Sequence, residues 1–177
     1  LSAVGERLLP MLKRIESALW SLGALAVIAL GLMITANVAA RAIFQTGIPD
    51  SVIIVRELMV AAIVLPLGAA TAARAHVAVE FVTNGLSPRK RSYLIGLGSL
   101  IGMFALMPLL FAGWRELSGT WSKGSFYFGD LGLPKWPGRL IFLVGIAVCW
   151  VRLAELAVRD TKTILGGGAV DEDEGAA

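Results

Sequence analysis

An uncharged run over residues 17–40 limits most strongly what this chain can fold into. A helix of this length is roughly 36 Å long, enough to cross a hydrocarbon core of about 30 Å. Basic residues precede the run, as in a secretory signal, but the apolar part of a signal usually covers only about 7 to 15 residues. We therefore expect a membrane-spanning helix. The sequence begins at Leu1 without a methionine, so we expect a processed N-terminus or one that lies further upstream.

Three further apolar stretches predict an all-α integral membrane protein with four transmembrane helices. With 56% hydrophobic and 16% charged residues, the chain is more apolar than an ordinary soluble domain. The expected spans cover residues 17–40, 51–73, 92–114 and 138–158. They form a single membrane domain over residues 1–165, followed by a disordered acidic tail over residues 166–177.

The fourth span is bounded by charges, because only residues 140–151 lack them. Arg139 and Arg152 are expected to extend their charged ends toward opposite interfaces. Arg152, Glu155 and Arg159 follow one another at i, i+3 and i+7, which stacks opposite charges on one helix face. Cys149 is the only cysteine and is expected to serve packing alone.

Basic residues cluster on one side of the predicted membrane. They flank the first span, the link between spans two and three, and the end of span four: Arg7, Lys13, Arg14, Arg74, Arg89, Lys90, Arg91, Arg152, Arg159 and Lys162. The positive-inside rule therefore predicts that both termini face the cytoplasm. This distribution also argues against a nucleic-acid partner. The long outer link over residues 115–138 is rich in aromatic side chains and is expected to pack on the membrane surface or on a partner.

The link between spans two and three is too short and too polar to cross the membrane. The spacing of Val77, Phe81 and Val82 predicts a short interfacial amphipathic helix. His76, the only histidine, precedes it at the water boundary, where it is expected to contact lipid headgroups or a neighbouring subunit.

No enzyme motif is found in the sequence, so no catalytic, cofactor-binding or metal-binding residue is expected. The candidates that remain are structural or interface residues. Glu57 lies near the start of span two, where a carboxylate is costly unless it is paired, and Arg41 at the end of span one is the expected partner. Gly98 and Gly102 have a small-xxx-small spacing that lets another helix approach closely.

Two stretches resemble a known family. "NVAARAIFQTGIPDSVIIVRELMV" (residues 37–60) and "PLGAATAARAHVAVEFV" (residues 66–82) are similar to the small membrane subunit, called Q or DctQ-like, of the tripartite ATP-independent periplasmic (TRAP) transporters. The matching residues are Asn37, Arg41, Glu57, Gly68, Arg74, His76, Val77 and Glu80, and "LPKWPG" (residues 133–138) resembles the approach to the family's last helix. Glu80 stands where the family more often has Asp.

The resemblance implies a bacterial inner-membrane complex, in which a periplasmic binding protein delivers an organic acid to a large membrane subunit. That large subunit would hold the substrate and sodium sites and move as an elevator. The small subunit, surrounded by membrane phospholipids, would hold its partner's scaffold in place and bind no cofactor. Its structural or interface residues would be Asn37, Arg41, Glu57, Arg74 and His76, to which the small-xxx-small spacing adds Gly98 and Gly102.

Two other functions stay open from the residues alone. The chain could be a self-sufficient homodimeric transporter that uses Glu57 as a proton-coupled carboxylate. It could also be a haem or quinone anchor in which two chains share His76, since a bis-histidine haem needs two axial imidazoles.

Overall fold

A computed structural model describes the backbone of residues 2–72 and 88–165. This part of the chain folds into five helices: α1 (Ser2–Phe44), α2 (Ser51–Val64), α3 (Leu67–Ala72), α5 (Pro88–Lys123) and α6 (Trp136–Leu165). The expected all-α architecture is confirmed. The expected interfacial helix, with Arg74, His76 and Glu80, lies outside the described residues, as does the expected acidic tail.

Four stretches are long and apolar enough to cross a membrane, as the sequence predicts. They cover Met11–Phe44, Ser51–Ala72, Ser92–Lys123 and Trp136–Ile164. The helices continue past the uncharged runs, because flanking charged residues are good helix formers. With 43 residues, α1 is about 64 Å long, so it must tilt or project beyond the membrane.

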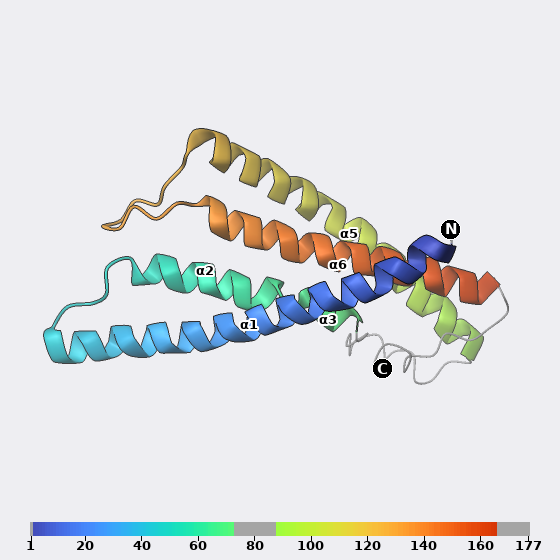
Figure 1. Cartoon of the computed structure of the whole chain (residues 1–177), viewed down its shortest axis with the longest axis horizontal. Coiled ribbons are helices and arrows are strands. Elements are labelled where there is room, and N and C mark those ends of the chain that lie inside the picture. Colours follow the sequence, from blue (N-terminus) through green and yellow to red (C-terminus); the bar gives the residue numbers. More distant parts are fainter. Residues whose placement is uncertain (1, 73–87, 166–177) are drawn as a thin grey trace.

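The helices lie side by side along one direction (Figure 1). α1 packs on α2, and α5 packs on α6, which gives two antiparallel helix pairs. α2 and α3 both pack on α6, so α6 joins the two pairs.

The core of the described part is small. It is formed by Leu19 and Ala26 of α1 together with Ala61 and Leu65, and α6 packs partly buried side chains against it. None of the described residues in the most apolar 18-residue window of α5 is buried. Helices in lipid gain little from burying apolar side chains, so these exposed faces are suited to lipid or to a partner subunit.

Span two is interrupted at Pro66, which has no backbone N–H to continue the helix. Small residues on both neighbouring helices accommodate the break. A Cβ atom on Gly145 of α6 would lie 2.6 Å from the Val64 carbonyl oxygen, and one on Gly23 of α1 would lie 2.9 Å from Pro66 Cδ. The interrupted backbone therefore packs closely against two helices instead of facing lipid.

Candidate functional site

Charged residues with polar partners gather at the two ends of the spans. We call the end with Asp50 and the α5–α6 loop the hairpin end, and the end with Glu16 and Arg152 the basic end.

Glu57 is the centre of the hairpin end. Tyr127, from the α5–α6 loop, donates a hydrogen bond from Oη to Glu57 Oε1 over 2.5 Å. Glu57 Oε2 is buried, accepts no hydrogen bond from the described residues, and lies against Gly138, in the first turn of α6. A Cβ atom on Gly138 would collide with this oxygen, so the glycine makes room for the carboxylate.

Two cations lie over the ring of Tyr127. Arg56 Cζ is 4.8 Å and Lys135 Nζ is 5.2 Å from the ring centroid, within the range of a cation–π interaction. Burial raises the pKa of Tyr127, and the hydrogen bond to Glu57 raises it further. The phenol therefore stays protonated at neutral pH and donates to Glu57. The sequence showed an aromatic loop but gave no signal that linked Tyr127 to Glu57.

The expected pair of Arg41 and Glu57 is not formed, because no ion pair joins them among the described residues. Glu57 points from α2 toward α6, whereas Arg41 lies beside the α1–α2 link. A Cβ atom on Gly47 would lie 3.0 Å from Arg41 Nε. Asn37 Oδ1 accepts a hydrogen bond from the backbone N–H of Ile48 over 2.9 Å. Asn37 thus closes the link between the first two spans.

The α5–α6 loop is an ordered hairpin that is bound to the start of α2. An antiparallel bridge joins Phe126 and Pro134. The Asp50 carboxylate accepts hydrogen bonds from the backbone N–H groups of Asp130 and Leu131, over 3.2 and 2.7 Å. Contacts within its own chain therefore hold the loop, and its packing on the membrane surface or on a partner stays a prediction. Phe128, near its tip, is 100% exposed.

Tryptophan side chains line an apolar groove of about 330 Å³ between α5 and α6. The rings of Trp121 and Trp136 meet edge to face, with centroids 5.2 Å apart. The remaining lining residues are Trp114, Leu117, Ser118 and Leu140. Tryptophans at this level are typical of the aromatic belt of a membrane protein.

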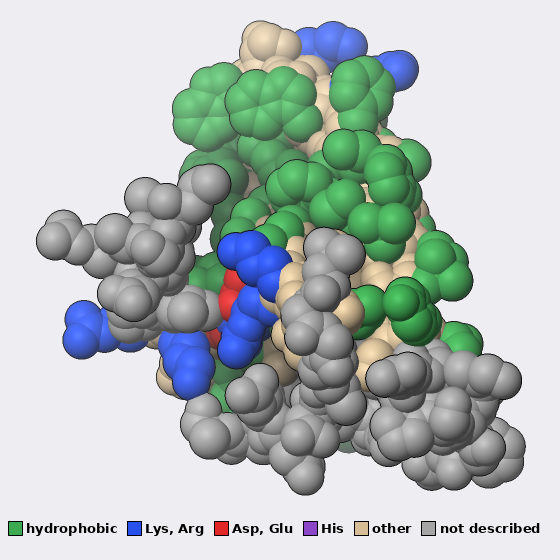
Figure 2. All heavy atoms as spheres, turned by 90° about the vertical axis from the view of Figure 1, so that its right-hand side faces the viewer, with side chains coloured by type: hydrophobic (Ala, Val, Ile, Leu, Met, Phe, Trp, Pro, Cys, Tyr) green, Lys and Arg blue, Asp and Glu red, His purple; other side chains and the backbone are tan. Residues whose placement is uncertain are grey.

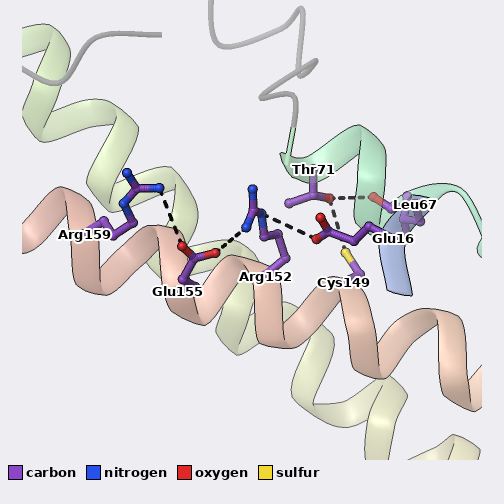
Figure 3. A network of polar contacts seen from close by, with 7 residues as sticks. All are labelled: Glu16, Leu67, Thr71, Cys149, Arg152, Glu155 and Arg159. Carbon is purple, nitrogen blue, oxygen red and sulfur yellow. Dashed lines mark hydrogen bonds and ion pairs between the residues drawn. The ribbon is translucent and has the colours of Figure 1, made fainter. Parts of the chain in front are cut away.

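The basic end has a chain of alternating charges. Figure 2 shows Lys and Arg side chains gathered around a small acidic patch at this end. Arg152 Nε lies 3.5 Å from Glu16 Oε1 of α1, and Arg152 Nη1 donates to Glu155 Oε2 over 2.5 Å (Figure 3). Arg159 Nη1 lies 3.6 Å from the other Glu155 oxygen. The predicted stacking of Arg152, Glu155 and Arg159 is confirmed.

The expectation that Arg152 extends toward the interface is wrong. Its side chain is 5% exposed, and that of Glu16 is 6% exposed, so the two charges are buried against each other. Glu16 directly precedes the uncharged run, outside the expected first span. The sequence gives no signal for its burial, because the neighbour that buries it comes from α6.

Cys149 takes part in a polar contact as well as in packing. The Thr71 hydroxyl donates to the Leu67 carbonyl over 2.9 Å, and its oxygen lies 3.3 Å from Cys149 Sγ. The hydroxyl proton is used by Leu67, so the thiol is the donor to Thr71. Thr71 and Cys149 are both buried near the Glu16–Arg152 pair (Figure 3).

Gly98 and Gly102 do not form one packing face within the chain. A Cβ atom on Gly102 would lie 3.4 Å from Leu153 Cδ1 of α6, so Gly102 lies in the α5–α6 contact. At Gly98, no atom of the described part of the chain lies within 4 Å of such a Cβ. In the described ranges, no group of three or more His, Cys, Asp or Glu side chains is suited to hold a metal ion.

In a comparison with protein families, the model for the DctQ component of the tripartite ATP-independent periplasmic transporters matches residues 30–163. This stretch contains the whole hairpin end, together with Arg152, Glu155 and Arg159 of the basic end. A comparison with curated proteins gave no match.

Proposed function

Since this chain belongs to the DctQ component family of the tripartite ATP-independent periplasmic transporters, we propose that it braces the large membrane subunit and carries no substrate itself. The family makes the chain a multi-pass membrane component of a transporter. In the proposal, the large subunit imports an organic acid with sodium coupling, after a periplasmic binding protein has delivered it. This chain binds no cofactor and resides in the bacterial inner membrane.

The observation that carries the proposal is the separation of the charges. In the described part of the chain, the two polar clusters are separated along α6, the central helix, by residues 140–151, which carry no charge. A carrier usually binds its substrate and coupling ion near the middle of the membrane. Because α6 has no charged side chain over this stretch, it offers no binding site for a charged substrate or ion there. This absence of charge is better suited to a subunit that supports another one.

The exposed apolar faces support a role in association. The most apolar 18-residue window of α5 has no buried residue among those described. Gly98 of α5 leaves room for a helix of another subunit to approach closely. Small residues let helix backbones approach in lipid, where packing replaces the hydrophobic driving force. We assign these faces to the large subunit and to phospholipids.

The chain's orientation follows from its basic residues. Figure 1 places the start of α1, the start of α5 and the end of α6 at the same end of the molecule. The basic residues 89–91 belong to the start of α5. By the positive-inside rule, this basic end faces the cytoplasm and the hairpin end faces the periplasm.

Reconstitution tests the proposal. The chain alone in liposomes under a sodium gradient should take up no organic acid, and adding the large subunit and the binding protein should start uptake. A tagged chain in mild detergent should also retain the large subunit during purification. Uptake by the isolated chain that Glu57→Gln abolishes would overturn the proposal and favour the self-sufficient carrier.

A further inference from the structure

α1 meets α6 through the charge of Glu16. α1 packs mainly along α2 and also contacts α3, but it shares no broad face with α6. The buried positions of its described side chains are Glu16, Leu19, Gly23 and Ala26, which follow one another at spacings of three and four residues. These positions form one face of a helix. Glu16 therefore continues the packing face of α1, and at its end the carboxylate meets Arg152.

Only part of this face constrains the position of α1 along its own axis. Gly23 packs closely on Pro66, whereas Leu19 and Ala26 make apolar contacts, which can be exchanged for others of similar size when a helix slides by one turn. Such a shift, about 5.4 Å along the axis, would bring Leu12 or Leu19 opposite Arg152. The shift would separate Arg152 from Glu16 and leave both charges among apolar side chains, which costs free energy.

The charges in this cluster balance one another. Glu16 and Glu155 each carry one negative charge, and Arg152 and Arg159 each carry one positive charge. Replacing a buried ion pair by apolar residues of similar size often costs no stability, whereas removing one partner is strongly destabilising. The Glu16–Arg152 pair therefore contributes little to the net stability of the contact between α1 and α6. Its main effect is to favour one position of α1 over the others.

We propose that Glu16 and Arg152 form a register latch, which sets the position of α1 along α6 while the apolar face supplies the adhesion. Glu155 supports the latch, because it binds Arg152 Nη1 and orients the guanidinium group toward α1. The latch is a property of the small subunit by itself and does not depend on its role in transport.

A distance measurement between spin labels tests the latch. Labels at Met11 of α1 and Val144 of α6, both exposed, are offset along the helix axes, so sliding of α1 changes their separation. Cys149→Ala removes the native thiol. By double electron–electron resonance, the parent chain should give one narrow distance distribution. The charge-free variant Glu16→Leu/Arg152→Met should broaden it or add a second distance several ångströms away.

The partly exposed ion pair of Glu116 and Arg139 provides the control, since it joins α5 to α6 at the hairpin end. Glu116→Leu/Arg139→Met should leave the α1–α6 distance distribution narrow. If Glu16→Leu/Arg152→Met does not fold, Glu16→Gln tests the same point, because the amide keeps the shape of the carboxylate without its charge. A single narrow distribution in either latch variant, once folded, would overturn the proposal.

Thermal unfolding of the same variants gives an independent readout. Arg152→Met alone leaves the buried Glu16 carboxylate without Arg152 and leaves Glu155 with Arg159 as its ion-pair partner, so it should lower the Tm more than the charge-free double variant does. A double variant whose Tm loss equals the sum of the two single losses would show that Glu16 and Arg152 act independently, and the latch would be wrong.

Discussion

The phenol of Tyr127 and the carboxylate of Glu57, 70 positions apart in the sequence, are hydrogen-bonded over 2.5 Å at the hairpin end. This contact binds the α5–α6 loop to the start of α2. The nearby Asp50 carboxylate strengthens this connection, because it accepts a hydrogen bond from the backbone N–H of Leu131 in the same loop. The two helix pairs are therefore joined at this end by polar contacts and in the middle by small-residue packing.

Removing the hydroxyl of Tyr127 should destabilise the chain. Tyr127→Phe leaves Glu57 Oε1 without its donor, and hydrogen bonds to charged groups contribute about 1.5–3 kcal/mol. Because the site is partly exposed, we expect a loss near or below the lower end of this range, measured as a lower Tm in detergent. Tyr93→Phe is the matched control, since Tyr93 is an exposed tyrosine on α5. An equal effect of both substitutions would contradict the assignment.

The Tyr127–Glu57 contact should also depend on pH. The pKa of Tyr127 is raised above its ordinary value of 10.0, first by burial and then by the bond to Glu57. A raised pKa in the folded state means that the protonated phenol is stabilised by folding. Its contribution is fully present below pH 10 and is lost as the pH rises through the raised pKa. The stability difference between the parent chain and Tyr127→Phe should therefore shrink in alkaline solution, and a difference that grows would contradict this.

A side chain at Gly138 should displace Glu57. The Cβ atom of Gly138→Ala would occupy the space of Glu57 Oε2, so the carboxylate must move away from Tyr127. Overpacking of this kind costs about 1–3 kcal/mol. Gly98→Ala should be neutral or stabilising, because no atom lies near that position and alanine favours helix. Truncating the clashing carboxylate in Gly138→Ala/Glu57→Ala should recover part of the lost Tm, and no recovery would point to another cause.

Cysteine labelling in a Cys149→Ala background should report the orientation. Phe128→Cys lies on the exposed hairpin and should react with a membrane-impermeant maleimide added to intact spheroplasts. Lys90→Cys, at the start of α5, should react only after the membrane is opened. The reverse pattern would invert the proposed topology.

The sequence by itself determined the number and type of the spans. Whether a stretch can cross a membrane depends on the length of its apolar run, which is a local property. The stacking of Arg152, Glu155 and Arg159 was predictable for the same reason, since helix geometry alone places these side chains on one face.

Only the tertiary structure decided which charges meet. Arg41 and Glu57 are close in sequence and at the same end of the spans, but α2 directs Glu57 toward α6 and Tyr127 instead. Arg152 could have extended into water, but the crossing of α1 brings Glu16 to it and buries both. These contacts depend on which helices are neighbours and how each is rotated. Such choices are made by packing between distant segments, so no local pattern in the chain encodes them.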